Sequence, residues 1–441
     1  MDYCPHTSDD INQMQAAIGV KSIEELFADI PGKFRLHRIP DMPASLSEQE
    51  VFGMMQAISG KNRIPRLTLT GAGAYAHFIP AVVGHIVGRA EFYTAYTPYQ
   101  AEISQGILQA IYEYQTMIAR LTGTEIANAS MYDGASSSAE AAVLSAKMSN
   151  RSKIVVARSV HPQYRQVLKT YCWANGYTIA EAPYTDSGQV DSTGLQNALD
   201  ESVAAVIVQS PNFFGCLEDI EPIADAAHKS GALLIAAFTE GTSLGILKPA
   251  GACGADFVVG EGQSFGNPVN YGGPYLGVFA AREKYMRRIP GRLAGATVDK
   301  NGKRGFVLTL QTREQHIRRE KATSNICSNE ALCALAAGVY LAALGKNLGK
   351  LASLNVCKAQ YLRNGLLQLA GWQEVFSAPV YNEFTLRCPD ARAVNEKLQA
   401  EGITGAYDLQ KDYPELANML LFCVTEMLSK NDMDRVIEII K

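Results

Sequence analysis

Two apolar runs near the middle of the chain, Val203-Ala204-Ala205-Val206-Ile207-Val208 and Ala232-Leu233-Leu234-Ile235-Ala236, decide its fold class. Each run is apolar at every position, which is typical of a strand whose two faces are both buried. Residues 219–230, which lie between the runs, have the spacing of apolar residues that favours a helix. A strand, a helix and a second strand in this order predict a parallel sheet with helices packed on both faces.

The same alternation extends outward on both sides of these runs. Further strands are predicted at residues 153–157, 177–180, 256–259 and 275–279, and a helix at residues 163–175. We therefore expect residues 91–345 to form a large α/β domain with a mostly parallel sheet. Ligands of open α/β sheets bind beyond the carboxyl ends of the strands, so we expect the functional site there.

The two ends of the chain have different patterns. Residues 1–90 predict a helical segment, with one helix beginning at Ser22, where Glu25 completes a capping-box pattern, and another over residues 47–60. A long helix is predicted from Thr97 to a stop at Gly123. Residues 346–441 predict a small C-terminal α+β domain. Its helices are expected at residues 351–369, 391–400 and 430–440, and its strands at residues 383–387, 405–409 and 420–424.

Composition excludes several classes of protein. The chain has 441 residues, of which 47% are hydrophobic and 19% charged, as expected of a globular protein with a large core. Its formal net charge of −4 argues against nucleic acid or an anionic membrane as the main partner. We expect no signal peptide, and residues 331–345, the longest apolar stretch, are too short to span a bilayer. The nine cysteines form no C-x-x-C pair, so we expect reduced thiols in a cytoplasmic protein without a metal site.

A candidate anion site is the run Asp133-Gly134-Ala135-Ser136-Ser137-Ser138, which precedes an alanine-rich helix. The first N–H groups of a helix and the positive end of its dipole bind phosphate well, and small hydroxyl residues add donors. Plain N-capping by Asp133 or Ser136 explains the same residues equally well. The sequence leaves both alternatives open.

Three other segments have the composition of functional loops. Residues 260–268 are rich in glycine and polar residues and follow a predicted strand, which is typical of an active-site loop, although an irregular connection has the same composition. A G-x-G at Gly71 and Gly73 predicts a turn where two backbones approach closely. Residues 312–327 are highly charged and either bind an anion or form a solvated face of mutual ion pairs.

Together these segments resemble one family, the glycine decarboxylase P-protein of the glycine cleavage system. In some organisms the P-protein is made of two separate chains, and this sequence resembles the first of them. The matching stretches are Tyr93-Thr94-Ala95-Tyr96-Thr97-Pro98-Tyr99-Gln100 with its continuation to Gly106, residues 128–134, residues 260–264 and Arg313-Glu314-Gln315-His316-Ile317-Arg318-Arg319-Glu320-Lys321 with its continuation to Cys327.

The resemblance implies a fold-type-I architecture, the fold of many enzymes that depend on pyridoxal phosphate (PLP), with active sites shared between two subunits. It implies decarboxylation of glycine and transfer of the remaining aminomethyl group to the lipoyl arm of the H-protein. It also implies a second P-protein subunit, which carries the lysine that binds PLP.

The resemblance also implies that the cofactor site of this chain is degenerate. Gln263 stands where the family has the PLP lysine, and an amide cannot form the Schiff base that this lysine forms. Glu240 stands near the position of the aspartate that pairs with the pyridine nitrogen in this fold. Asp133, Gly134 and Ser136 correspond to the phosphate end. We therefore expect PLP in the partner subunit and no cofactor covalently bound to this chain.

The resemblance places two groups of residues of this chain at the partner's active site. One group is Tyr96, Tyr99 and Gln100, although Thr97 as N-cap and Gln100 three residues later also fit a capping box. The other group is Thr323, Ser324 and Asn325, whose hydroxyl and amide groups are suited to a phosphate.

Two alternative functions remain. One is a self-sufficient PLP enzyme, such as an aminotransferase or a desulfurase, that uses another lysine; Gln263 argues against it. The other is a structural subunit that only stabilises a catalytic partner.

Overall fold

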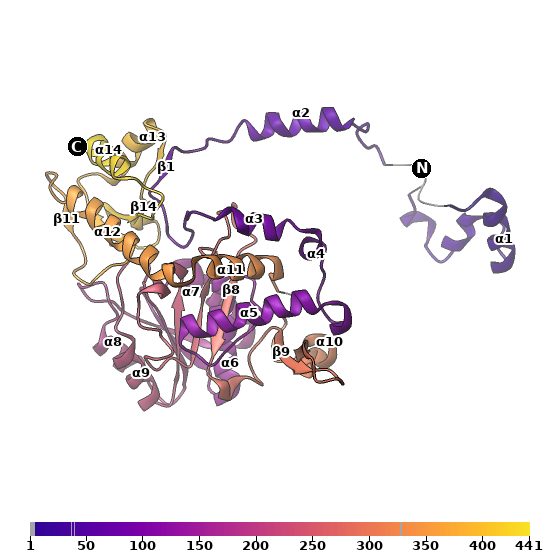
Figure 1. Ribbon diagram of the computed structural model, residues 1–441, viewed down its shortest axis with the longest axis horizontal. Coiled ribbons are helices and arrows are strands. Elements are labelled where there is room, and N and C mark those ends of the chain that lie inside the picture. The colour runs from indigo at the N-terminus through magenta and orange to yellow at the C-terminus, as the bar shows by residue number, and fades with distance from the viewer. Residues whose placement is uncertain (1–4, 37, 39, 327–328) are drawn as a thin grey trace. The chain divides into compact units, whose positions relative to one another are not determined.

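The computed structural model describes residues 5–36, 38, 40–326 and 329–441 (Figure 1). The first four residues and two of the nine cysteines, Cys4 and Cys327, lie outside the described residues. The chain divides into two compact units, Met1–Ile64 and Pro65–Lys441.

The first unit contains short helices with exposed surfaces. Its α-helices are α1 (Ser8–Ile18) and α2 (Glu48–Ser59), and neither contains a buried residue. Helix α2 confirms the helix predicted over residues 47–60, with Ser47 and Glu50 forming a capping box. The helix predicted at Ser22 is present as a 3₁₀ helix, η1 (Ile23–Phe27), but the predicted capping box is wrong, because the Ser22 side chain caps nothing. Glu25 instead accepts the backbone N–H of Lys21, which leaves the reciprocal half of the capping box unmade.

The second unit is built on a seven-stranded sheet of order β2-β8-β7-β6-β5-β3-β4. The strands are β2 (Ile126–Ala127), β3 (Lys153–Ala157), β4 (Thr178–Ala182), β5 (Val203–Gln209), β6 (Leu233–Phe238), β7 (Phe257–Glu261) and β8 (Gly277–Ala281). Strands β3 to β7 are parallel, whereas β8 runs antiparallel to both β7 and β2. The mostly parallel sheet predicted from the apolar runs is therefore confirmed.

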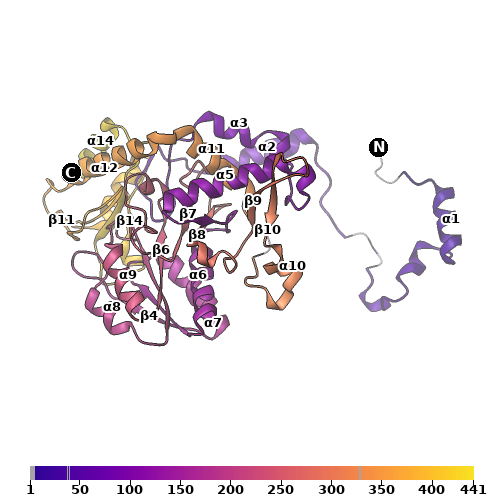
Figure 2. The same cartoon turned by 60° about the horizontal axis from the view of Figure 1, so that its bottom comes forward.

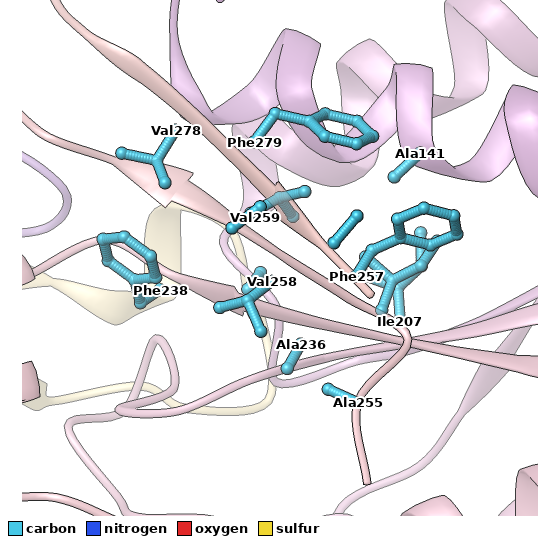
Figure 3. Packing of buried hydrophobic residues seen from close by; sticks show 14 of the residues in the cluster. Ala141, Ile207, Ala236, Phe238, Ala255, Phe257, Val258, Val259, Val278 and Phe279 are labelled. Carbon is cyan, nitrogen blue, oxygen red and sulfur yellow. The ribbon is translucent and has the colours of Figure 1, made fainter. Parts of the chain in front are cut away.

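Helices cover this sheet on both faces, as the uninterrupted burial of β5 and β7 requires (Figure 2). The helices packed on it are α5 (Gln105–Thr122), α6 (Gly134–Ser149), α7 (Pro162–Asn175), α8 (Ser192–Ala198) and α9 (Ile220–Lys229). Helix α6 crosses β5 to β8, and its Ala141 lies beside Phe257 and Phe279 in the core (Figure 3). The small side chains of α6 let the helix approach the sheet closely, so that the aromatic rings fill the remaining space.

The long helix before the sheet begins later than its sequence predicts. Helix α5 starts at Gln105, not at Thr97, and ends as expected at Gly123, which has a left-handed backbone. A 3₁₀ turn, η3 (Ala101–Ile103), precedes the helix, and Ser104 at φ −121° and ψ 21° separates the two. The capping box predicted for Thr97 and Gln100 is therefore wrong.

Two glutamines of α5 hold the hairpin of β9 (Leu293–Val298) and β10 (Arg304–Thr309). Gln115 donates to the carbonyl of Ala294 at 3.0 Å and accepts the N–H of Ala294 at 2.9 Å. Gln105 makes the same pair of bonds with Phe306, at 2.8 and 2.9 Å. Each side-chain amide thus pairs with one residue of an open strand edge as a neighbouring strand would.

Helix α11 (Ala331–Leu344) packs against α5 and α3 (Ala81–Val87). Together with α12 (Leu348–Leu366), α11 forms an apolar stretch that is long enough to cross a membrane by length and composition alone. The 3₁₀ turn η8 (Gly345–Asn347) interrupts the stretch, and Ala337 and Tyr340 are buried in the main core. Helix α11 is therefore a core helix.

The small C-terminal domain has a four-stranded sheet of order β11-β12-β15-β14. Its strands are β11 (Gln373–Glu374), β12 (Glu383–Arg387), β14 (Tyr407–Asp408) and β15 (Met419–Cys423), and α13 (Ala391–Ala400) and α14 (Lys430–Ile440) pack beside α12 and β13 (Ile403–Thr404). Its helices and strands confirm the predicted order, with shifts of a few residues. Strand β1 (Leu67–Thr68) pairs with β13, and from there the chain runs into the large domain.

Candidate functional site

The carboxyl ends of β3, β6 and β7 meet residues 69–78, which pack between these strand ends and the small domain. We call this filled junction the crevice. His161 follows β3, Glu240 follows β6 and Gln263 follows β7. All three side chains contact the segment of residues 72–77. The predicted location of the site, beyond the carboxyl ends of the strands, thus brings two of the expected residues, Glu240 and Gln263, to one place.

Gln263 is almost fully buried, with 2% of its surface exposed, and both ends of its amide are engaged. Its Oε1 accepts the backbone N–H of Tyr75 at 2.9 Å, and its Nε2 donates to the carbonyls of Tyr75 at 3.0 Å and Asn267 at 2.6 Å. The side chain at the expected lysine position therefore has a structural role that a donor-only ammonium cannot reproduce.

Glu240 belongs to a buried charged triad. The ring of His77 lies between Glu240, 2.8 Å from Nε2, and Glu426, 2.8 Å from Nδ1. Burial by itself disfavours a charged imidazole, but the two carboxylates raise the pKa of His77 to about 10. Asn382 and Thr242 donate to Glu240 as well, so the carboxylate is fully paired.

A second acidic group, Glu383 of β12, reaches the crevice from the small domain. It accepts the N–H of Ala72 and the hydroxyl of Tyr75, each at 2.7 Å. Burial raises the pKa of the Glu383 carboxyl to about 7. Tyr75 lies with its hydroxyl 3.0 Å from Thr239, so this one side chain connects β6 to the small domain.

His161 begins α7 and lies on the other side of the segment. Its Nε2 is 2.9 Å from the carbonyl of Ala72, and its Nδ1 accepts the N–H of Gln163 at 3.1 Å. Nε2 is therefore the protonated nitrogen, and burial lowers the pKa of His161, so that the ring is a neutral donor. Phe213 packs edge-on against it, with ring centroids 4.7 Å apart.

The N-terminus of α6, the expected phosphate end, is occupied by acidic side chains of the chain itself. Asp133 accepts the N–H of Ser136 at 2.7 Å in a capping box, and Glu261 accepts the N–H of Gly134 at 3.1 Å. Glu261 also accepts the N–H groups of Gln263 and Leu276. Burial raises the pKa of Glu261 to about 8, against the lowering effect of these backbone donors.

The residues expected to face a partner lie elsewhere. Tyr96, Tyr99 and Gln100 line one surface cleft of about 660 Å³, and Tyr96 is 88% exposed. The Tyr99 hydroxyl accepts from Arg292 at 2.8 Å, and its ring lies 5.6 Å from the ring of His316. The structure thus joins two of the segments that carry the family resemblance.

Thr323, Ser324 and Asn325 do not line that cleft. They follow the turns η6 (Gln311–Arg313) and η7 (Arg319–Lys321) and the short helix α10 (Gln315–Arg318), and Ser324 lies near the buried Glu140 of α6. Thr323 and Ser324 are half-buried, whereas Asn325 is exposed. The two expected groups are therefore separate on this chain.

Sequence reasoning missed the residues that fill the crevice, chiefly Tyr75, His77, Glu383 and Glu426. The only signal was the G-x-G of residues 71–73, which predicts close backbone approach but not its partners. His77 and Glu426 are 349 positions apart, and no local pattern connects them.

The fold and this crevice define the class of protein: a fold-type-I PLP-dependent enzyme architecture. The solved sphingosine-1-phosphate lyase of Burkholderia pseudomallei has the same fold, with a TM-score of 0.68 at 16% identity over 94% of this chain and 93% of that chain. A NifS-like protein of Rickettsia africae matches with a TM-score of 0.63 over 85% of this chain and 98% of that chain, at 15% identity.

Within that class, the chain belongs to the glycine cleavage system P-protein family, whose family model matches residues 1–440. A solved glycine decarboxylase (P-protein) in inhibitor-bound form covers all of this chain and 99% of its own, with a TM-score of 0.90 and 43% identity. Probable glycine dehydrogenase (decarboxylating) subunit 1 of Desulfitobacterium hafniense is 52% identical over 99% of this chain and 98% of that protein. The protein of the same description from Moorella thermoacetica is 51% identical over 99% of this chain and 98% of that protein.

The residues present do not fit the PLP that this fold class implies. The lysine position holds Gln263 with its amide engaged, and the N–H groups of Gly134 and Ser136 at the α6 N-terminus already donate to Glu261 and Asp133. The nearest lysine upstream of the loop, Lys248, lies exposed in an ion pair with Glu221. No reaction step is therefore assigned to a cofactor in this crevice.

Proposed function

We propose that this chain works as subunit 1 of a two-chain glycine dehydrogenase (decarboxylating). In this assembly a second subunit supplies the lysine and PLP, glycine is decarboxylated, and the aminomethyl group passes to the lipoyl arm of the H-protein. The observation that carries the proposal is Gln263, buried and engaged at the lysine position in a chain that matches subunit 1 proteins over its full length.

The proposal assigns a division of labour between the two chains. PLP, when bound to the partner, supplies the electron sink for loss of the carboxylate. This chain supplies surface residues that border the partner's site: the phenols of Tyr96 and Tyr99, the amide of Gln100, and the small polar run Thr323-Ser324-Asn325. The exposure of Tyr96 and its place in a cleft support this assignment, because an exposed aromatic in a concave surface is suited to meet a partner.

We propose that the assembly works in the cytoplasm, and the cysteines support this location. The seven cysteines among the described residues are free thiols, and four of them are buried. Free thiols are typical of a reducing compartment, so we place the assembly in the cytoplasm.

The assembly is tested by co-purifying this chain with the lysine-bearing second subunit and measuring glycine decarboxylation with lipoylated H-protein. We expect turnover from the pair and none from either chain alone. Turnover or an aldimine absorbance band from this chain alone would contradict the proposal and favour a self-sufficient PLP enzyme.

The role of the tyrosines is tested in the assembled pair with Tyr96→Phe and Tyr99→Phe. We expect either change to lower turnover about tenfold or more, because a phenol that bonds the transition state contributes on the order of 1.5 kcal/mol. Assembly and the thermal midpoint of the Tyr96→Phe protein should stay the same, since Tyr96 is exposed. Full turnover in both variants would leave these residues as interface packing.

The phosphate contact is tested with Thr323→Ala. A hydroxyl bonded to the partner's PLP phosphate predicts that PLP affinity of the complex falls about tenfold or more. Lys300→Ala, at the exposed turn between β9 and β10, is the matched control and should leave PLP affinity unchanged.

A further inference from the structure

Residues 71–77 lie where a fold of this class holds its ligand. They fill the crevice, so no ligand is needed to satisfy its polar groups. We infer that this segment is a built-in occupant of the crevice, which takes up the space and the polar contacts of a cofactor and keeps this chain closed to PLP. The inference goes beyond the proposed function, since it concerns what replaces the cofactor in this chain and holds whichever partner supplies catalysis.

The first contact is at the lysine position. The amide of Gln263 pairs with both backbone groups of Tyr75, as one residue of a strand pairs with its neighbour. This pairing fixes the backbone of Tyr75 across the crevice mouth. A ligand that approached residue 263 would have to break both bonds and leave two buried backbone groups without partners.

The second contact is at the position of the pyridine ring nitrogen. In this fold an acidic side chain at the end of this strand pairs with a protonated heteroaromatic N–H of the cofactor, and here Glu240 pairs with the N–H of the His77 ring. His77 is therefore placed as an internal substitute for that cation. Glu426 holds its other nitrogen, so the ring cannot turn away without breaking its ion pairs with both carboxylates.

The third contact is with His161, which follows β3. Gly73, at φ +99°, lies against His161 so closely that a Cβ added to it would be 2.7 Å from Nε2 of that ring. The neighbouring carbonyl of Ala72 accepts from the same nitrogen. The backbone of the segment thus occupies the space around the Nε2 edge of this imidazole.

The phosphate end of the crevice does not contact the segment. Other side chains of the protein fill it. A Cβ on Gly134 would lie 1.9 Å from the Tyr164 hydroxyl oxygen, which shows how tightly this end is packed. The N–H of Gly134 already donates to Glu261. A phosphate would meet two acidic side chains, Asp133 and Glu261, and lose the backbone donors that normally bind it.

Amide hydrogen exchange of the full chain tests the occupant directly. Ala72, Tyr75 and Phe78 each donate their N–H to a side chain across the crevice, so residues 70–78 should exchange at least about a hundredfold more slowly than the exposed, irregular residues 41–46. Addition of PLP at millimolar concentration should change neither rate. Exchange of residues 70–78 as fast as residues 41–46, or exchange accelerated by PLP, would overturn the inference.

Chemical rescue with imidazole tests whether the ring of His77 is the cation that pairs with Glu240. His77→Ala should lower the thermal midpoint by several degrees, and added imidazole should recover part of that loss in a saturable way because it can refill the space beside Glu240. The matched control is His228→Ala, which removes a histidine paired to Asp256 at 2.7 Å outside the crevice, where the ring is 42% exposed. Added imidazole should not raise the thermal midpoint of the His228→Ala protein. Equal recovery in both variants, or none in either, would overturn the role assigned to His77.

The lysine position gives an independent variant. Gln263→Lys should take no reducible PLP and should speed exchange of residues 70–78, because an ammonium cannot accept the N–H of Tyr75. A pyridoxyl-lysine at residue 263 after borohydride reduction would show that the segment yields its place to the cofactor, contrary to the inference.

Discussion

His77 holds a proton between two carboxylates, and this proton couples stability to pH. Its pKa is raised from 6.5 to about 10, so the folded chain binds one more proton than the unfolded chain between those values. A raised pKa gives stability that is complete below about pH 6.5 and is lost as the pH rises through 10. We expect the free energy of unfolding to fall by up to about 1.4 kcal/mol per pH unit in this range on account of His77.

The check is a comparison of the chain with His77→Gln by denaturant unfolding between about pH 7.5 and 9.5. The stability difference between the two proteins should shrink as the pH rises. The carboxyl of Glu261, whose pKa is about 8, also titrates in this range. It does so in both proteins, so its contribution to the stability difference cancels. A difference that stays constant with pH would mean that His77 is neutral in the folded chain.

Removal of the hydroxyl should change the free energy of unfolding differently at two buried tyrosines of the crevice. Among the described residues, the Tyr164 hydroxyl has no hydrogen-bond partner, whereas the Tyr75 hydroxyl bonds Glu383 and Thr239. Tyr75→Phe should therefore cost about 1.5–3 kcal/mol of unfolding free energy, and Tyr164→Phe should leave it unchanged or raise it. Equal losses in urea unfolding would show that Tyr164 also has a partner.

At the residue scale, the assignment of Gln263 and Glu240 to a degenerate cofactor site stays a prediction, and the sequence did not indicate which residues they contact. Gln263 and Glu240 were predicted through the family resemblance. The partners of Glu240 and Gln263, His77 and Tyr75, lie 163 and 188 positions away in the chain. Pairings of that kind depend on the tertiary fold, which no local spacing encodes.

At the scale of elements, the strands were predictable and the start of α5 was not. Continuous apolar runs locate β5 and β6 because burial on both faces leaves no other composition. The N-terminus of α5 depends instead on the contact of Gln105 with Phe306 of β10, and residues 101–104 turn to make it. A tertiary contact of this kind overrides a capping pattern that is favourable locally.

We expect the side chain of Gln115 to contribute strongly to the stability of the β9–β10 hairpin. Gln115→Leu keeps the size of the side chain but leaves both backbone groups of the buried Ala294 without partners, so we expect a loss of about 1–3 kcal/mol and faster amide exchange in β9. The control is Gln109→Leu on the same helix, which loses only a surface bond to Glu113 and should stay within about 0.5 kcal/mol.

At the scale of the molecule, the chain contains two units of very different packing. Helix α2 exposes a row of large apolar side chains, with Phe52 at 65% and Met55 at 54% exposure. The hydrophobic core clusters formed by the described residues all lie within residues 65–441. The sequence predicted the helical character of the first unit. It did not predict that the unit would end at Ile64, because residues 65–77 pair with β13 of the small domain and fill the crevice.

Limited proteolysis should separate the two units. Residues 40–47 are exposed and have no regular structure, so we expect early cleavage there. The product that contains residues 65–441 should keep the thermal midpoint of the full chain, since its core clusters are intact. First cuts within residues 65–441, or a product that unfolds at a much lower temperature, would contradict this division.

The two hydrogen bonds between the amide of Gln263 and the backbone of Tyr75 make a change of Gln263 to lysine costly for folding. A single change from glutamine to lysine leaves the N–H of Tyr75 without an acceptor in a buried place, so the first mutant on a path back to catalysis folds less well than its parent. Recovery would need the crevice segment to be displaced in the same lineage before any activity rewards the change. Under the proposed function, a PLP site at residue 263 would therefore need changes in residues 71–77 as well as at Gln263.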